Sequence, residues 1–170
     1  MINIRPARAS DLPAIDSLLD DRFGPARRNR TAYRLRDGVD PDGELSFVAY
    51  DHHRLIGSLQ CWPLRLRSIT GTTLPLTLLG PVVTAADRQG EGIATCLMQA
   101  ALAAVDARGA GPVLLIGDEP FYGRFGFSAA ATSGWLLPGT VDRARLLLRA
   151  NCAMPAVGWV EPGDAVRRAA

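Results

Sequence analysis

A glycine-containing turn between an apolar segment and a helical segment is the part of this sequence best suited to bind a charged ligand. The apolar run at residues 78–84 is followed by Gln89-Gly90-Glu91-Gly92-Ile93-Ala94. Glycines have no Cβ, so backbone N–H groups can come close to an anion, and the first N–H groups of a helix are unpaired and carry partial positive charge. The segment therefore predicts a phosphate or pyrophosphate site, with a plain tight turn as the alternative.

Two common phosphate-binding motifs do not fit this turn. A dinucleotide fingerprint needs a third glycine where this sequence has Thr95, and it usually follows the first strand, whereas three predicted strands precede this turn. A P-loop needs a lysine, and all 19 basic residues are arginine. A mononucleotide-binding domain of another kind stays open as a third hypothesis.

Pro81 gives a second indication of the ligand. A proline inside an apolar strand donates no ladder hydrogen bond and is found at edges or bulges. A bulge would leave the main-chain groups of residues 82–84 free to pair with an extended ligand that contains amides. A phosphate at the helix and an amide-bearing arm along the strand together describe coenzyme A. A simple strand end at Pro81 is the alternative.

The same segments resemble a known enzyme family. Residues 89–94 match the Gln/Arg-x-x-Gly-x-Gly/Ala motif of the GCN5-related N-acetyltransferases, and Phe121-Tyr122-Gly123-Arg124-Phe125-Gly126-Phe127 matches the family's Tyr-x-x-x-Gly-Phe signature. With the preceding run Val113-Leu114-Leu115-Ile116-Gly117-Asp118, the sequence is similar to the predicted bacterial acetyltransferases of the YhbS type. The resemblance covers roughly residues 1–150.

The resemblance implies an α/β fold, the acyl-CoA N-acyltransferase fold with a mixed and splayed central sheet. It implies transfer of an acetyl group from acetyl-CoA to a primary amine, by direct attack in a ternary complex and without a metal. Relatives often pair as dimers, and the acceptor would be a small-molecule or peptide amine. By position, the resemblance implies that Tyr122 is the general acid and that coenzyme A is bound by Val82, Val83, Thr84, Gln89, Gly90, Glu91, Gly92, Ile93 and Ala94.

Tyr122 has chemistry that suits the implied role. A phenol with a pKa near 10 can donate a proton to a leaving thiolate with a pKa of about 8.5. Beside Phe121 and Phe125, Tyr122 could instead be a core aromatic, but we favour the catalytic role. No general base can be assigned, because Asp118 and Glu119 are expected to cap a helix and ordered water could accept the proton.

A second hypothesis comes from a different functional class. The same fold could serve as a non-catalytic acyl-CoA-binding sensor or interaction module, which would need no acid at Tyr122. The sequence does not identify the acceptor. Residues 20–36, which are expected to frame it, contain several arginines that could bind a carboxylate or phosphate, although exposed arginines are the commoner explanation. They are Arg22, Arg27, Arg28, Arg30 and Arg34.

Apolar spacing and turn residues predict the elements that position these segments, in the order β-α-α-β-β-β-α-β-α-β. Strands are predicted at 2–5, 46–50, 54–67, 74–84, 113–116 and from Phe127 onward. Helices are predicted at 10–21, 28–35, 91–108 and, as one short turn, at 118–124. Residues 143–149 fit either a strand or a helix, and Trp159 and Val160 are expected to end the fold.

Length and composition limit the other possibilities. The chain has 170 residues, 48% of them hydrophobic and 21% charged, which predicts one domain at 1–160 and a polar tail at 161–170. A net charge of +2 argues against a nucleic-acid partner, and no membrane span or signal peptide is predicted. Three separate cysteines and two adjacent histidines form no zinc or disulfide pattern, so we expect no metal and a cytoplasmic location.

Overall fold

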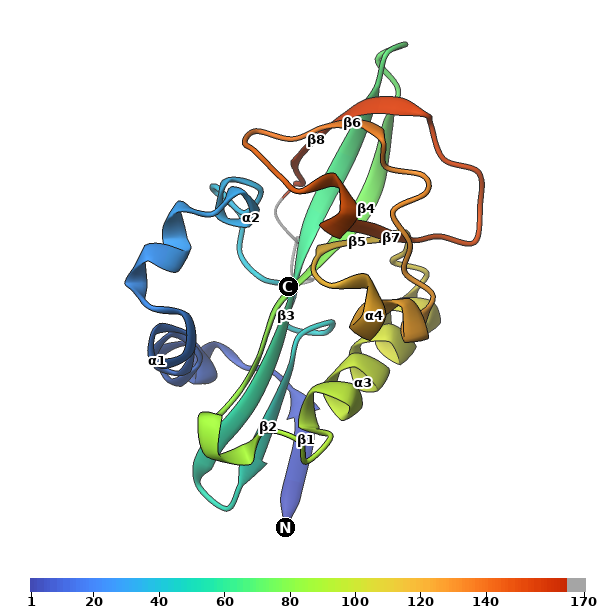
Figure 1. Ribbon diagram of the computed structural model, residues 1–170. Coiled ribbons are helices and arrows are strands. Elements are labelled where there is room, and N and C mark those ends of the chain that lie inside the picture. The colour runs from blue at the N-terminus through green and yellow to red at the C-terminus, as the bar shows by residue number, and fades with distance from the viewer. Residues whose placement is uncertain (165–170) are drawn as a thin grey trace, which may run out of the picture. The chain divides into compact units, whose positions relative to one another are not determined.

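The computed structural model describes residues 1–164. Its strands form one mixed sheet of eight, with hydrogen-bonded neighbours in the order β1-β2-β3-β4-β5-β7, while β8 pairs with β3 and with β6. The elements, labelled in Figure 1, are β1 (Ile2–Pro6), α1 (Leu12–Phe23), α2 (Thr31–Arg34), β2 (Phe47–Asp51), β3 (Arg54–Ser68), β4 (Thr73–Thr84), α3 (Ile93–Arg108), β5 (Val113–Ile116), α4 (Glu119–Tyr122), β6 (Gly134–Leu136), β7 (Leu146–Arg149) and β8 (Val157–Pro162). The predicted α/β fold class is confirmed, as is the predicted order of elements from β1 to α4.

Residue contacts divide the chain into two compact units. The first unit contains Met1–Asn29, Pro41–Cys61 and Gly80–Gly109, and the second contains Arg30–Asp40, Trp62–Leu79 and, of the described residues, 110–164. Strands β3 and β4 contribute to both units because the division falls within each of them. The glycine-containing turn belongs to the first unit, and Tyr122 belongs to the second.

In the first unit, α1 covers one face of the antiparallel strands β1, β2 and β3. Ile15 and Leu19 are four residues apart, so they lie on one side of α1. They form a buried cluster with Val48 of β2 and Val83 of β4. This cluster positions the C-terminal part of β4, which leads directly into the turn.

Helix α3 covers the other face of the same strands. Ala49 is buried like its neighbour Val48, and adjacent strand residues point to opposite faces, so both faces are covered. Ala49 pairs with Gly57 of β3, where a Cβ would lie only 2.8 Å from Ile93 Cγ2. Figure 1 shows α1 and α3 on opposite sides of β2 and β3. Gly57 therefore allows the start of α3 to pack closely on the sheet.

The second unit has its own apolar core. Its strand pairs are antiparallel for β3 with β8 and for β5 with β7, and parallel for β4 with β5 and for β6 with β8. Trp135 is fully buried, and its Nε1 donates a hydrogen bond to the Pro155 carbonyl at 2.8 Å, so its polar atom is satisfied. The buried residues of this core are Leu35, Leu64, Leu66, Leu76, Leu78, Leu114, Trp135, Leu146, Leu148 and Val160.

The C-terminal third differs from the sequence-based prediction. The predicted strand from Phe127 is wrong, because Ser128 forms only an isolated bridge with Leu148 and the next strand is β6. The ambiguous residues 143–149 form a 3₁₀ turn at Arg143–Arg145 and then β7. Strand β8 was not predicted, and it continues to Pro162, so the tail predicted from residue 161 begins inside a strand. The rest of that tail, residues 165–170, lies outside the described residues.

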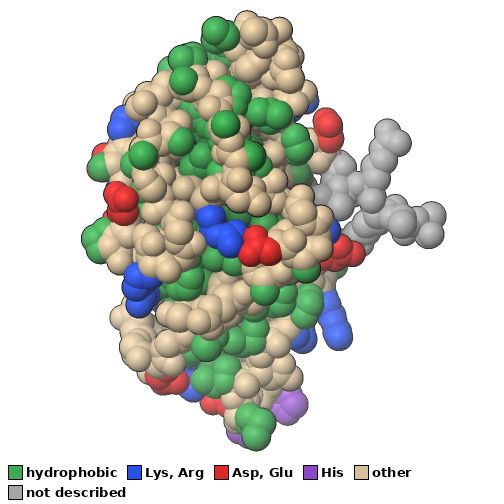
Figure 2. Space-filling model, turned by 90° about the vertical axis from the view of Figure 1, so that its right-hand side faces the viewer, with side chains coloured by type: hydrophobic (Ala, Val, Ile, Leu, Met, Phe, Trp, Pro, Cys, Tyr) green, Lys and Arg blue, Asp and Glu red, His purple; other side chains and the backbone are tan. Residues whose placement is uncertain are grey.

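Two predicted helices are shorter than expected. The helix predicted at 28–35 is a 3₁₀ turn at Pro25–Asn29 followed by the four residues of α2. Helix α3 begins at Ile93 because Gly92, its N-cap residue, has a left-handed backbone. Among residues 1–164, no helix combines the length and hydrophobicity needed to cross a membrane. On the face drawn in Figure 2, charged side chains are dispersed among neutral and hydrophobic atoms and form no large patch of one sign.

Candidate active site

The turn between β4 and α3 exposes its backbone. Gly90 and Gly92 have φ values of +83° and +78°, in the left-handed region that disfavours residues with a side chain. Nothing lies within 4 Å of the position that a Cβ would occupy at either glycine. Glycine is therefore required by the backbone conformation, and the space beside the turn is open to a ligand.

The first turn of α3 offers several hydrogen-bond donors. Cys96 N–H makes the first bond back into the helix, to the Gly92 carbonyl at 3.0 Å. The N–H groups of Ile93, Ala94 and Thr95 consequently have no acceptor within the helix. These donors and the helix dipole favour an anion at this end. The geometry fits a phosphate or a pyrophosphate group.

Ion pairs attach this turn to the β2–β3 hairpin. Arg88 donates to Glu91 at 2.8 Å and to Asp51 at 2.9 Å, and these two carboxylates raise the pKa of Arg88. Arg54 binds Asp87 through two hydrogen bonds of 2.7 Å. The Glu91 carboxylate is directed to Arg88, so the predicted contribution of Glu91 to ligand binding can only come from its main chain.

The predicted pantetheine strand forms the end of β4. Val83 is buried against α1, whereas Val82 and Thr84 are half-buried and point to the opposite face of the strand. Strand β4 ends where the N–H of Ala85 donates to the Ile56 carbonyl at 2.9 Å. Pro81 lies inside β4 and has no N–H, while the bulge expected there stays a prediction.

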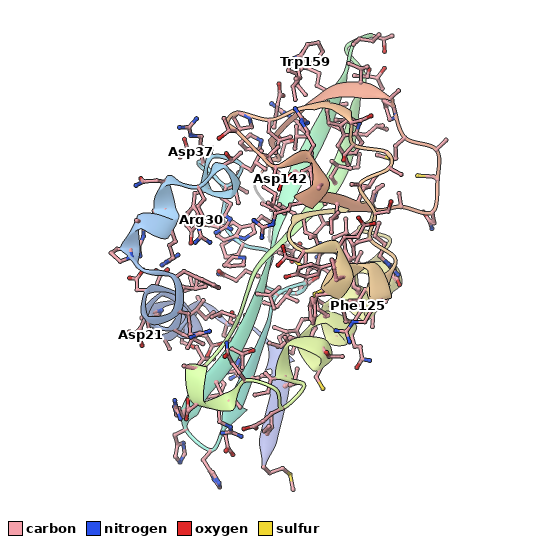
Figure 3. The ribbon with its side chains drawn as sticks, viewed as in Figure 1. Asp21, Arg30, Asp37, Phe125, Asp142 and Trp159 are labelled. Atoms are coloured by element: carbon pink, nitrogen blue, oxygen red, sulfur yellow. The ribbon has the colours of Figure 1, made fainter. Side chains whose placement is uncertain are left out.

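Tyr122 ends the short helix α4 in the second unit. Its ring lies edge-on to Phe121, with 4.8 Å between the ring centroids, and against the backbone of Gly117. Burial, together with the nearby negative charge of Asp118, raises the pKa of the Tyr122 phenol. Within the described residues, its hydroxyl makes no hydrogen bond to protein. Tyr122 is therefore a protonated donor at neutral pH. Phe125, labelled in Figure 3, follows α4 in the next turn.

The two acidic residues beside Tyr122 are not arranged as a base. The Asp118 carbonyl accepts hydrogen bonds from the N–H groups of Phe121 and Tyr122, both at 3.1 Å. The Asp118 carboxylate accepts a hydrogen bond from Arg145 Nε at 3.1 Å, and Glu119 is exposed. Asp118 thus caps α4, as the sequence predicted, but it does so with its backbone rather than with its side chain.

The sequence suggested that the arginines following α1 are exposed, but one of them is buried. Arg27 is only 3% exposed, and it donates to Asp16 at 2.9 Å and to Asp20 at 2.8 Å. Arg28 also binds Asp20. These contacts fold the segment after α1 back onto the helix, and Asp21, labelled on α1 in Figure 3, takes no part in them. The sequence feature that could have indicated these ion pairs is the spacing of Asp16 and Asp20, which lie on one side of α1, from Arg27.

Two glycines outside the two signatures have a packing role that the sequence did not indicate. Gly57 gives room for Ile93 in the first unit, and Gly117 gives room for Tyr122 in the second unit. Within residues 1–164, no three His, Cys, Asp or Glu side chains are grouped so that they could hold a metal ion. Cys61 is buried, which raises the pKa of its thiol, so it is unsuited to act as a nucleophile.

Comparisons with known proteins agree with these features. The family model described as "Acetyltransferase (GNAT) domain" matches residues 3–130. An uncharacterized N-acetyltransferase of Streptomyces avermitilis is 32% identical over 121 residues, which are 70% of this chain but only 26% of that longer protein. The uncharacterized N-acetyltransferase YhbS of Escherichia coli K12 is 30% identical over 124 residues, covering 71% of this chain and 70% of YhbS.

Two solved structures extend the likeness to three dimensions. E. coli YhbS in complex with CoA matches with a TM-score of 0.72 and 27% identity, covering 94% of this chain and 88% of that one. A GNAT family acetyltransferase from Brucella melitensis, in complex with acetyl-CoA, matches with a TM-score of 0.67 and 26% identity, covering 95% of each chain. On the strength of the family model and of YhbS, this chain belongs to the GNAT family of acetyltransferases.

Proposed function

We propose that this protein is an N-acetyltransferase that transfers an acetyl group from acetyl-CoA to a primary amine. The observation that carries the proposal is the open turn at Gly90 and Gly92, whose unobstructed backbone leads into the free N–H groups of α3. The two similar structures contain CoA and acetyl-CoA, respectively, which supports the same ligand here. The proposal includes the cytoplasmic location expected from the sequence.

The proposed contacts follow from the donors available in the first unit. Main-chain N–H groups of residues 89–94 bind the pyrophosphate, which the Gly90 and Gly92 backbones can approach without a side chain in the way. Main-chain groups of Val82, Val83 and Thr84 pair with the amides of the pantetheine arm and with the thioester carbonyl. A backbone N–H aimed at that carbonyl oxygen stabilises the negative charge that develops on it.

The proposed reaction is a direct transfer. The amine nitrogen attacks the thioester carbon, the C–N bond forms and the C–S bond breaks. The departing thiolate takes a proton from the Tyr122 hydroxyl, and the amine proton passes to water. The raised pKa of Tyr122 keeps the phenol protonated at neutral pH, so the proton is present when the thiolate departs. Much of the acceleration comes from holding the two reactants together.

A charge placed at the turn tests this proposal. Gly92→Asp adds a side chain and a negative charge where pyrophosphate would bind, and calorimetry should detect no CoA binding to the folded variant. Gly109→Asp is the matched control, because Gly109 also has a left-handed backbone with nothing within 4 Å, but it lies at the other end of α3. The control should bind CoA like the wild type. Wild-type affinity in Gly92→Asp would contradict the proposed site.

Release of free thiol from acetyl-CoA in the presence of an amine panel tests turnover. An N-acetyltransferase releases thiol with at least one amine, and Tyr122→Phe should reduce the rate by about 100-fold while acetyl-CoA still binds. CoA binding without thiol release from any amine would instead indicate an acyl-CoA-binding sensor. Thermal protection by ATP but not by CoA would indicate a mononucleotide-binding domain.

A further inference from the structure

Arg22 differs from the other arginines of the first unit. Six of them bind a carboxylate, and one, Arg8, is exposed to solvent. Arg22 is half-buried, and its Nε is shielded from solvent without a hydrogen-bond partner. Within residues 1–164, its guanidinium forms no ion pair. The paired arginines are Arg5, Arg27, Arg28, Arg54, Arg88 and Arg108.

The position of Arg22 on α1 turns it toward the sheet. Residues three and four apart lie on the same side of a helix, so Ile15, Leu19 and Arg22 form one stripe. Ile15 and Leu19 of this stripe pack against Val48 and Val83. Arg22 therefore occupies a position where a core-facing helix would normally carry another apolar residue.

The face of the sheet that α1 covers also carries polar groups without hydrogen-bond partners. Ser58 pairs with Val48 in the β2–β3 register, so both point to the α1 side of the sheet. Ser58 is 1% exposed, and its Oγ has no hydrogen-bond partner. Gln60, two residues further along β3 and on the same face, is 6% exposed, and its amide makes no hydrogen bond within the described residues. Burying such groups without partners costs free energy, so a ligand that satisfies them would be bound favourably.

We infer that the acceptor is an amine that also carries a carboxylate, which is bound by the Arg22 guanidinium while Ser58 and Gln60 form hydrogen bonds to the same molecule. The inference rests on the proposed acetyltransferase activity. A guanidinium matches the two oxygens of a carboxylate with parallel hydrogen bonds. A carboxylate is favoured over a phosphate because, among the described arginines of the first unit, Arg22 is the one that is half-buried and has no ion pair, so the site offers a single guanidinium.

Matched amines provide the test. Thiol release from acetyl-CoA is measured with amino acids and their decarboxylated partners: L-histidine with histamine, L-phenylalanine with phenethylamine, and L-tryptophan with tryptamine. Phosphoethanolamine is added to detect a phosphate preference. For at least one pair, the wild type should have a kcat/KM about 10-fold or more higher for the member with the carboxylate.

Variants at Arg22 assign this preference to the guanidinium. Arg22→Met keeps the unbranched stem, and it should lower kcat/KM for the amino acid by roughly 10- to 100-fold while changing the value for its decarboxylated partner less than about 2-fold. Arg22→Lys keeps the positive charge and should restore part of the preference. Arg8→Met is the control for loss of an arginine from this unit, and its kinetics should match the wild type.

Ser58→Ala separates a binding role from a structural one. If Ser58 serves the acceptor, removing its unpartnered hydroxyl should raise KM for the amino acid, with the melting temperature unchanged or higher. A hydroxyl that supports the fold would lower the melting temperature on removal. An equal loss for both amines of a pair in Arg22→Met, or a wild-type ratio near one in every pair, would overturn the inference and leave the acetyltransferase proposal intact. A preference for phosphoethanolamine would also overturn it, whereas absence of both CoA binding and thiol release would overturn the proposed function itself.

Discussion

Gly117 controls the position of the proposed acid, and its substitution gives the sharpest prediction for the second unit. A Cβ at Gly117 would lie 2.8 Å from Tyr122 Cδ2 and still closer to Tyr122 Cε2. Non-bonded carbon atoms prefer about 3.5 Å or more, so the ring in Gly117→Ala must move by roughly 1 Å. Gly117 does not have a positive φ, and alanine therefore adds no backbone strain at this position.

The displacement should reduce turnover more than it reduces stability. A misplacement of about 1 Å in a reacting group can cost on the order of 100-fold in rate, so kcat should fall by about that factor. Overpacking costs about 1–3 kcal/mol, of which the lower entropy of the unfolded alanine chain returns about 0.4–1 kcal/mol. The melting temperature should therefore fall by a few degrees for a chain of this size.

A double-mutant cycle separates the two effects. Thiol-release kinetics and melting curves are measured for the wild type, Gly117→Ala, Tyr122→Phe and the double variant. A phenylalanine ring meets the same Cβ, so the stability cost of Gly117→Ala should persist in the Tyr122→Phe background. The loss in kcat should disappear there, because no hydroxyl remains to be misplaced.

Two results would refute this reasoning. Wild-type kcat in Gly117→Ala, at saturating acetyl-CoA and with chemistry limiting, would mean that the ring position does not matter for turnover. An equal loss of kcat in the wild-type and Tyr122→Phe backgrounds would mean that the glycine acts through the fold of α4 and not through the hydroxyl. In either case, Gly117 would not act by positioning the Tyr122 hydroxyl, and the rate of Tyr122→Phe alone would decide whether Tyr122 is the acid.

Two further predictions concern the first unit. Gly57→Ala places a Cβ 2.8 Å from Ile93 Cγ2. Denaturation should show a free energy of unfolding about 1–3 kcal/mol lower, and calorimetry should show weaker CoA binding. Unchanged affinity would show that the start of α3 tolerates the shift. The pKa of Asp11 is lowered from 3.8 to about 2, chiefly by Arg5, which donates two 2.8 Å hydrogen bonds, and further by hydrogen bonds from the Arg8 backbone and Tyr50. Because the pKa of Asp11 is lower in the folded state, its ionisation contributes roughly 2 kcal/mol to the free energy of unfolding above pH 4, and this is lost as the pH falls toward 2. Asp11→Asn should remove that part of the pH dependence in melting curves. An unchanged pH profile would contradict the prediction.

The sequence predicted the ligand-binding turn well because its requirements are local. Positive φ values at Gly90 and Gly92, and unpaired N–H groups at the start of a helix, depend on the residues of the turn itself. Their motif could therefore be recognised without any knowledge of the sheet. The two glycines that make room for Ile93 and Tyr122 could not be predicted as site residues, since their role depends on contacts made after folding.

The fold was less predictable toward the C-terminus for a related reason. Strand β6 has three residues, too few to show an alternating pattern. Its partner strand, β8, lies more than 20 residues further along the chain. Gly158 lies within β8 and weakens its strand signal. Long-range pairing rather than local preference forms these strands, whereas β3 and α3 are long enough to be identified from their own patterns.

Polar groups in the first unit follow two different rules, and the contrast bears on function. Asp11, Arg27 and Asp42 are buried, and each is bound by charged partners, as expected where burial must be compensated. Ser58 and Arg22, in the same unit, are exceptions, because Ser58 Oγ and Arg22 Nε are shielded from solvent and have no hydrogen-bond partner. Elsewhere in this unit, buried charges are paired. A partner for Arg22 and Ser58, or an apolar residue in place of either, would remove the free-energy cost of leaving their polar atoms unpaired. The free energy that these unpartnered groups cost would be offset when an acceptor binds to them, which is why Ser58→Ala should raise KM for the amino acid without lowering the melting temperature.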